Sequence, residues 1–373
     1  MNDHEGTASE SLNRLPEFIL IVALLKFLLK KGAFLLITLL IATYMTVAIA
    51  NFGGLLDQTL KSEIRFQVRQ DLLRREEFRR LPPDEQQRII EEESAKLIQL
   101  RGLNEPYPTK SLRQTWEALT LTLGDATQLR SAVGSYKTYD IILERLPRTV
   151  ILFTGSTILS AIIGIPLGLR MARRALSAMD RGLTMLSITT LVVPSWIFGI
   201  IFILLFSYGL NIFPSGGLVS PEVSKDPYAF FADFMWHLAL PLIAVTFSSF
   251  GGWSYVTRNL VLQIMDEDFV AAARSRGLPE KLVRRRYVLR AASPPIVTSI
   301  ALALIGSWTG AIVTETVFNW PGLGLLYFQA ILAIDAPIIV AITVIYAMLF
   351  VLMIFLLDLT YGLLDPRIRA KGA

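Results

Sequence analysis

Six uncharged apolar runs constrain the fold of this chain more than any other feature. Each spans about twenty residues or more and contains no Asp, Glu, Lys or Arg. A bilayer core about 30 Å thick needs roughly 20 apolar residues per helix, and its backbone groups must be satisfied internally. The runs predict an all-α integral membrane protein with six transmembrane helices. They are Ala33–Phe52, Thr149–Leu169, Leu183–Tyr208, His237–Thr257, Pro295–Thr314 and Ala336–Leu357.

Composition supports this class and excludes several others. Of 373 residues, 53% are hydrophobic and 18% charged, whereas soluble domains carry about a quarter charged residues. The chain has no cysteine, and its two histidines, His4 and His237, are far apart. Disulfides, iron–sulfur clusters and Cys- or His-based metal sites are therefore not expected. The net charge of +5 is too small to indicate nucleic acid as a partner.

The placement of Lys and Arg predicts which side each loop faces, because short cytoplasmic loops are enriched in these residues. With the N-terminus inside, the Arg170–Gly182 loop holds four, the Arg258–Pro294 loop eight and the C-terminal tail three. The short loops on the opposite side, Gly209–Trp236 and Glu315–Asp335, together hold one lysine. We expect six crossings with both termini in the cytoplasm.

The 96 residues between the first two runs, 53–148, have the composition of a soluble segment, with sixteen Lys or Arg and fifteen Asp or Glu. By the predicted topology this segment lies outside, since long translocated segments escape the charge rule. Helix is favoured from Leu56 to about Arg80, and Pro83 starts a second helix running to about Leu100. The apolar stripe of the second helix favours a helical hairpin over the alternative, a disordered charged spacer.

A shorter apolar stretch, Phe18–Leu25, precedes the first run. Eight residues cannot cross a bilayer, and Lys26, Lys30 and Lys31 separate the stretch from Ala33–Phe52. Because these charges follow the apolar stretch rather than precede it, an interfacial helix is expected here and not a cleaved signal peptide.

The sequence contains no sign of its own energy source. A phosphate-binding loop of the G-x-x-x-x-G-K-[ST] kind requires a Gly-Lys step, and none occurs. The six runs also lack the ionisable residues of proton- or sodium-coupled carriers. A secondary carrier or a channel remains the alternative class; the glycine-rich Pro321–Leu326 could be imagined as a filter, but an external turn and a short interfacial helix are favoured.

The loop between the fourth and fifth runs is the most informative. It reads DEDFVAAARSRGLPEKLVRRRYVLRAASPP from Asp266 to Pro295, a run of helix formers interrupted at Gly277 and Pro279. This pattern predicts two short helices at an angle, which would form a projecting knob. The alternative is a solvated basic loop that only obeys the charge rule for cytoplasmic segments.

This loop resembles the EAA motif of ATP-binding-cassette importer permeases, in which Gly follows Glu-Ala-Ala after three residues. Gly277 fixes the register, Ala272 and Ala273 match, and Ala271 stands where the general pattern has Glu. Such departures are typical of the dipeptide, oligopeptide and nickel branch. Two other stretches, ETVFNWPGLGLL from Glu315 and DLTYGLLDPRIR from Asp358, are similar to the same branch.

The resemblance implies a six-transmembrane-helix type I ABC importer transmembrane domain with a long, partly helical external insertion. Its parts are an N-terminal cytoplasmic or interfacial segment, the first transmembrane helix, the external insertion and a five-helix permease core that carries the cytoplasmic coupling loop. These correspond to residues 1–32, 33–52, 53–148 and 149–373, with the loop at 258–294.

In this family the knob is a coupling helix that docks on a nucleotide-binding subunit; here it would be Phe269–Arg276. Phe269, Val270 and Leu278 are the candidate apolar anchors, surrounded by cations that pair with acidic residues of the partner. The residues expected to couple to the ATPase are Asp268, Phe269, Val270, Ala271, Ala272, Ala273, Arg274, Arg276, Gly277 and Leu278.

The resemblance also implies the partners. They are a second homologous permease, two nucleotide-binding ATPase subunits, an extracytoplasmic substrate-binding protein and membrane lipid, in the plasma (inner) membrane of a prokaryote. ATP and Mg are bound by the ATPase subunits, and this chain needs no cofactor, metal or catalytic residue of its own. Dipeptides or oligopeptides are the expected substrates, with oligosaccharides or nickel as alternatives within the family.

Small, hydroxyl and aromatic residues occur inside two runs. They could line the substrate pathway, although small residues in membrane helices more often serve helix packing. The candidate pathway residues are Ser248, Ser249, Trp253, Ser307 and Trp308.

The predicted topology can be tested with reporters that are active only outside the cytoplasm. Fusions near Arg80, Lys225 or Leu323 should be active, because the predicted topology places the long segment 53–148 and the two cation-poor short loops outside. Fusions near Arg174, Arg284 or Lys371 should be inactive. An active fusion at Arg284 would contradict the whole scheme, since the coupling loop must face the ATPase.

Overall fold

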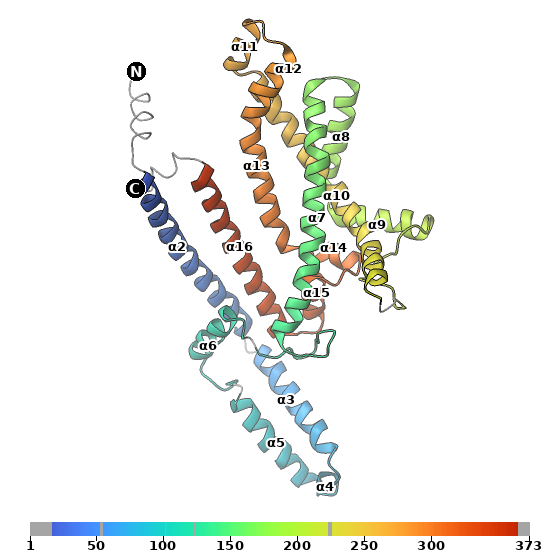
Figure 1. Ribbon diagram of the computed structural model, residues 1–373. Helices are drawn as coiled ribbons and strands as arrows, with labels where there is room; N and C mark the ends of the chain where they lie inside the picture. Colours follow the sequence, from blue (N-terminus) through green and yellow to red (C-terminus); the bar gives the residue numbers. More distant parts are fainter. Residues whose placement is uncertain (1–16, 53–54, 101, 123, 223–225, 365–373) are drawn as a thin grey trace. The chain divides into compact units, whose positions relative to one another are not determined.

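The computed structural model describes residues 17–52, 55–100, 102–122, 124–222 and 226–364, and these residues are mostly helical (Figure 1). Within them the only extended pairing is one isolated bridge between Asp125 and Lys137. The chain forms two compact units, residues 1–142 with 329–373 and residues 143–328. The last long helix therefore belongs to the same compact unit as the first. The amino-acid composition instead predicts a domain boundary after residue 148.

The first unit contains two long apolar helices and a group of shorter ones. Its helices are α2 (Glu17–Asn51), α3 (Leu55–Leu73), α4 (Glu76–Arg79), α5 (Pro83–Leu100), α6 (Tyr107–Leu119) and α16 (Ala336–Leu364).

Helices α2 and α16 pack side by side (Figure 1). Val47 of α2 is buried with Val340 and Val344 of α16. Lys31 pairs with Asp358 at 3.2 Å, which places a cation beside the one carboxylate of the otherwise uncharged α16. Helix α2 also continues without a break through Phe18–Leu25, so the expected interfacial helix is not a separate element. The lysines that follow are good helix formers, and nothing in this stretch terminates a helix.

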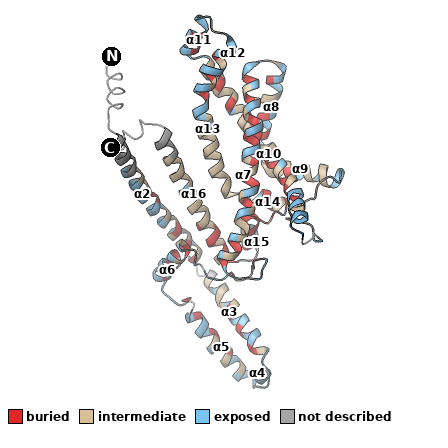
Figure 2. Ribbon diagram, viewed as in Figure 1, coloured by how far each residue is buried: buried red, intermediate tan, exposed pale blue. Residues whose placement is uncertain are grey.

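The hairpin predicted in the insertion is present as α3 and α5. The first helix ends at Leu73, earlier than expected, and the short α4 follows before Pro83 opens α5. Buried and exposed residues alternate along both helices (Figure 2). An apolar core fills the space between the helices, which a disordered spacer would not have. Its buried members are Ile64, Val68, Leu72, Phe78, Ile90, Ile98 and Leu103.

Polar contacts connect the insertion to the long helices of the same unit. Lys110 of α6 is buried and pairs with Asp57 of α3. Asn51, at the end of α2, donates a hydrogen bond to Gln114 at 2.6 Å. Asp335 is fully buried and accepts hydrogen bonds from the backbone N–H groups of residues 127, 128 and 129, which fixes that loop beside the start of α16.

The second unit contains the remaining long helices. They are α7 (Thr138–Arg173, of which residues 143–173 belong here), α8 (Ala178–Val192), α9 (Ser195–Phe202), α10 (Pro227–Met265) and α13 (Leu289–Gly306). Shorter elements are the π-helical turns η1 (Ile203–Gly209) and η2 (Val283–Val288), α11 (Asp268–Ser275), α12 (Glu280–Leu282), the 3₁₀ turn η3 (Ser307–Thr309), α14 (Ile312–Val317) and α15 (Leu323–Leu332).

Glycines let α7, α8 and α10 approach closely. A Cβ at Gly164 of α7 would lie 2.5 Å from the Phe250 carbonyl oxygen of α10, and one at Gly168 would lie 2.8 Å from the Thr257 Cβ. Gly251 of α10 meets the backbone of Ser187 in α8 at similarly short range. Small residues at helix contacts allow this packing where apolar surface alone gives helices no preference over lipid.

Two predicted spans differ from the structure. The run Leu183–Tyr208 is not one straight helix, because α8 and α9 with η1 meet at an angle of 102°. Pro194 lies at the break, and its missing N–H and fixed φ end α8. The helical segment of the fifth predicted run, α13 followed by η3, ends at Thr309 rather than at Thr314, because Gly310 takes φ +66°. Among the residues that the structure describes, five helices are long and apolar enough to cross a membrane, or six if the bent pair is one span.

The close packing of α7 on α10 predicts a large effect of a single methyl group. Gly164→Ala should lower the thermal unfolding temperature of the purified protein, since overpacking costs about 1–3 kcal/mol. Gly182→Ala in α8 is the matched control, because nothing lies within 4 Å of its added Cβ and alanine is the better helix former. Equal unfolding temperatures for both variants would contradict this account of the helix contact.

Candidate functional site

The predicted knob is present as α11, which contains eight residues, followed by a sharp turn. The Ala-rich stretch forms the helix, and Gly277 ends it with φ +74°, donating its N–H to the Arg274 carbonyl at 2.9 Å. This left-handed conformation is one that glycine adopts without strain. Pro279 then opens α12, which continues through η2 into α13. The two short helices at an angle that the sequence predicts are therefore observed.

One face of α11 anchors the knob to its own unit. Val270 is fully buried and Ala273 is 1% exposed. Both belong to a cluster with Val261 of α10, Val283 and Val288. The knob thus packs against α10 and against η2, which leads into α13.

The opposite face of α11 is exposed. Phe269 is 45% exposed although it lies next to the buried Val270. Leu278 is half-buried against the same cluster as Val270. Of the three apolar anchors considered from the sequence, Phe269 is the one whose side chain lies on the surface. The other exposed residues of the knob are Asp268, Ala271, Ala272, Arg274, Ser275, Arg276 and Gly277.

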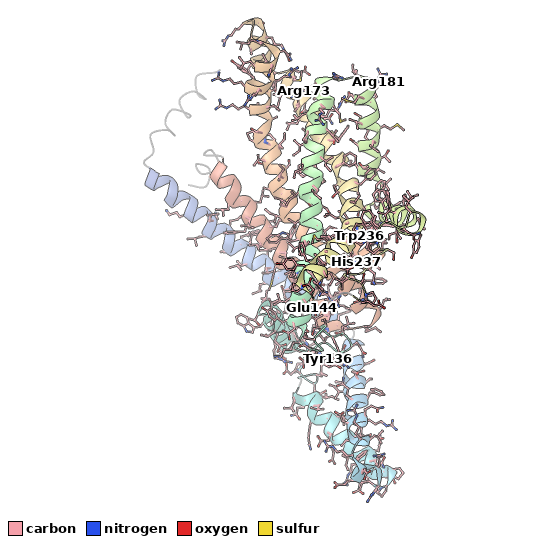
Figure 3. The ribbon with its side chains drawn as sticks, turned by 45° about the vertical axis from the view of Figure 1, so that its right-hand side comes forward. Tyr136, Glu144, Arg173, Arg181, Trp236 and His237 are labelled. Carbon is pink, nitrogen blue, oxygen red and sulfur yellow. The ribbon has the colours of Figure 1, made fainter. Side chains whose placement is uncertain are left out.

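A buried ion pair supports the region behind the knob. Asp180 at the start of α8 is 1% exposed and receives two hydrogen bonds from the guanidinium of Arg258 in α10, at 2.6 and 2.7 Å. Asp180 also accepts the Leu176 N–H at 2.8 Å. This bidentate geometry fixes the turn between α7 and α8 to α10. Figure 3 shows Arg173, the last residue of α7, and Arg181, near the start of α8, at the same end of the unit as the knob.

The candidate pathway residues divide between two environments. Trp253 lines a groove of about 330 Å³ together with Tyr255, Asn259 and residues of α13. Ser248 and Ser249 are half-buried in α10.

The pathway candidates near Gly310 lie in a packed contact. The Ser307 hydroxyl lies 2.8 Å from the Thr154 hydroxyl of α7, a helix-to-helix hydrogen bond. Trp308 is half-buried in η3. Ser307 thus contributes to helix packing, the alternative considered for these small polar residues.

A second cluster, centred on Glu315, was not recognised from the sequence. Glu315 in α14 is fully buried, although it lies outside the helices long enough to span a membrane. Its carboxylate accepts hydrogen bonds from the Thr149 hydroxyl at 2.8 Å and the Leu325 N–H at 3.0 Å. Thr149 in turn accepts the Leu323 N–H at 2.7 Å. The cluster therefore ties α14 and the start of α15 to α7.

The residues around Glu315 explain the motif ETVFNWPGLGLL. A Cβ at Gly322 would clash with the Glu315 carboxylate and the Thr149 hydroxyl, so only glycine fits. Trp320 is fully buried and donates its indole N–H to the Arg148 carbonyl at 3.1 Å. An acidic residue followed by closely spaced glycines was the available sequence signal, but no chemical role follows from that pattern alone. The turn and short helix predicted for Pro321–Leu326 are observed, with α15 starting at Leu323.

Burial raises the pKa of Glu315 to about 7, while the hydrogen bonds from Leu325 and Thr149 oppose this change and the Arg145 charge opposes it less. An ordinary glutamate in water has a value near 4.5. Near neutral pH, folding around this carboxyl therefore favours its protonated form.

The fold and these two clusters define a class: a membrane protein of several apolar helices with a small, exposed helical knob between two of them. Comparison with known proteins identifies the family. The model of the "Binding-protein-dependent transport system inner membrane component" family matches residues 164–370, more than half of the chain. The chain belongs to this family, as the resemblance of its loop predicts, and it is the membrane permease of such a system.

Curated relatives extend the match beyond the family model. The oligopeptide transport system permease protein AppB of Bacillus subtilis is 32% identical over 76% of this chain and 87% of its own. The dipeptide transport system permease protein DppB of Escherichia coli K12 is 30% identical over the same shares. The peptidoglycan transport system permease protein YejB of Agrobacterium fabrum is 32% identical over 73% of this chain and 75% of its own.

Glu315 predicts a pH dependence of stability. Because its pKa is raised on folding, ionisation opposes the folded state, so stability should fall as pH rises from about 4.5 to about 7 and then level off. A shift of this size corresponds to a few kcal/mol. Glu315→Gln keeps the shape and stays neutral, so its unfolding temperature should fall less between pH 5 and pH 7.5 than that of the parent. Parallel curves for the two proteins would contradict the buried-carboxyl account.

Proposed function

We propose that this chain forms half of the translocation pathway of an ATP-driven importer of dipeptides or oligopeptides. The relatives support this substrate class, since two of the three are permeases of oligopeptide or dipeptide transport systems. The peptidoglycan transport relative supports a second candidate, a substrate derived from peptidoglycan. The binding protein outside would select among these substrates, because the six predicted runs of this chain contain no charged side chain that could recognise one of them.

The observation that carries the proposal is the division of α11 into two faces. Val270 and Ala273 lie inward, while Phe269 and the cations Arg274 and Arg276 lie on the surface. A partner that accepts an aromatic ring and pairs with the cations could therefore move the knob. Because the inward face belongs to the cluster of α10 and η2, a displacement of the knob would displace these helices too.

The partners and orientation follow from this role. Two nucleotide-binding subunits hold ATP and Mg, and each docks on one knob, so a second permease of the same type completes the pathway. The knob must face the cytoplasm, which agrees with the basic composition of its loop and with both termini on that side. A substrate-binding protein delivers the peptide from the opposite side. This chain carries out no catalysis in the cycle.

Two substitutions in the knob test the proposal in the assembled transporter. Phe269→Asp places a carboxylate where an apolar docking cleft is expected, at a cost of several kcal/mol. Gly277→Val strains the turn by about 1 kcal/mol or more through its positive φ alone, because nothing lies within 4 Å of an added Cβ. Both should reduce ATP-driven peptide uptake into proteoliposomes severalfold and uncouple or abolish ATP hydrolysis.

The controls are conservative changes at the same positions. Phe269→Leu keeps an apolar side chain, and Gly277→Asn keeps a residue that tolerates the left-handed region. Both controls should retain most of the uptake. If Phe269→Asp and Gly277→Val transport peptide and hydrolyse ATP like the parent, the loop is only a basic connection and the proposed coupling is wrong.

A further inference from the structure

Helix α3 of the insertion carries a row of cations on its surface. Lys61, Arg65 and Arg69 are four residues apart, so they share one side of the helix. This side of the helix is adjacent to its buried side, since Ile64 and Val68, which are buried, directly precede Arg65 and Arg69 in the sequence. In the described part of the chain, no carboxylate forms an ion pair with any of the three.

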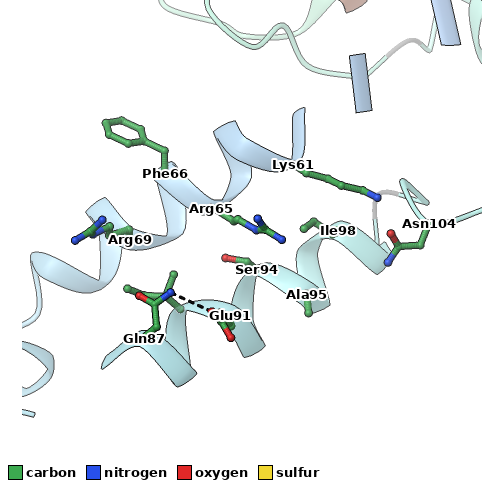
Figure 4. Close-up of a pocket in the computed structure, with 11 residues that line it drawn as sticks. Lys61, Arg65, Phe66, Arg69, Gln87, Glu91, Ser94, Ala95, Ile98 and Asn104 are labelled. Atoms are coloured by element: carbon green, nitrogen blue, oxygen red, sulfur yellow. Dashed lines mark hydrogen bonds between the residues drawn. The ribbon is translucent and has the colours of Figure 1, made fainter. Parts of the chain in front are cut away.

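The cationic row forms one wall of a groove between α3 and α5 (Figure 4). The groove has a volume of about 640 Å³. Its floor includes Ile90 and Ile98, and its one carboxylate, Glu91, already accepts a hydrogen bond from Gln87 at 3.0 Å. A groove with an apolar floor and three cations against one anion suits an acidic segment with some apolar side chains.

Phe66 adds an exposed aromatic ring to the same surface. Its side chain is 58% exposed. Phe66 also lines a second groove of about 550 Å³ on its other side, where Arg130 stacks on Tyr136 at 4.4 Å. An exposed aromatic ring between two grooves and beside cations has the features of an interface anchor.

We propose that this surface of α3, formed by Lys61, Arg65, Phe66 and Arg69, docks an acidic surface loop of the substrate-binding protein. The inference rests on the proposed function, which places the insertion on the side from which that protein delivers substrate. The cations accelerate and orient the encounter, and Phe66 retains the bound partner. These long charged side chains, which have no ion-pair partner among the described residues, gain one in the complex.

The test uses the complete importer in nanodiscs and the purified substrate-binding protein of the same system, loaded with peptide. ATP hydrolysis is measured as the concentration of binding protein is raised. Arg65→Glu with Arg69→Glu should raise the half-saturating concentration about tenfold and leave the maximal and basal rates unchanged. Raising the salt concentration should weaken the parent more than this double variant, because exposed charges are screened.

Two further variants separate charge from packing and from misfolding. Arg88→Glu with Lys96→Glu changes the charge by the same amount on α5, outside both grooves, where its surface ion pairs contribute little. This control should change the half-saturating concentration less than twofold. Phe66→Ala should raise it severalfold, with the salt dependence of the parent retained.

Each contrary result has a distinct meaning. An unchanged half-saturating concentration for Arg65→Glu with Arg69→Glu overturns the docking surface while leaving the importer intact. If that variant instead loses binding to phosphatidylglycerol-containing vesicles and keeps its response to the binding protein, the surface meets lipid and the proposal is wrong. If even the parent importer shows no stimulation by any concentration of binding protein, the proposed function and this inference both fall.

Discussion

Close contact between the backbones of α7 and α10 is the constraint on which the second unit depends. At Gly164 and Gly168 even one extra carbon would collide with α10. Lipid tails are as apolar as leucine, so a membrane helix gains little by burying apolar surface against another helix. Close steric fit between the helices, together with polar contacts, must therefore determine how they pack. The bidentate Asp180 to Arg258 pair supplies the strongest such contact in this unit.

The same constraint explains what could and could not be predicted from the sequence. Uncharged runs long enough to span a bilayer locate helices because every backbone group there needs an internal partner. The register of the knob was also predictable, since Gly277 is a local signal for a positive φ and the structure has it. Which side chains of the knob are buried and which are exposed could not be predicted. Val270 and Phe269 are adjacent apolar residues, and only packing against Val283 and Val288 makes one buried and the other exposed.

Bends and buried carboxylates were harder to predict for a different reason. Pro194 inside an apolar run was compatible with a tolerated kink or a full break, and the 102° angle depends on what α9 packs against. The aromatic contacts of Phe202 with Phe206 and Phe247 show part of that packing. Glu315 was visible at the end of a run, yet its partners Thr149 and Leu325 come from distant or following segments. No local pattern encodes that three-way contact.

Helix α10 connects the two clusters of the second unit. Its 39 residues span about 58 Å, from Asp226, which caps its first turn through the Ala229 N–H, to the turn that leads into the knob. Near its middle the buried residues Leu240 and Ala244 belong to the same cluster as Phe318 and Trp320, the residues next to Glu315.

Helix α10 packs against both clusters and carries Pro241 within its length. The knob is fixed to one end of α10 by Val270 and Ala273, and the Glu315 segment packs on its middle through Phe318 and Trp320. Displacing the knob must therefore shift the Glu315 segment or break well-packed contacts, since close-packed interiors change between discrete arrangements and do not deform smoothly. The segment that holds the buried carboxyl and the knob thus pack on the same helix, although about 50 residues of sequence separate them.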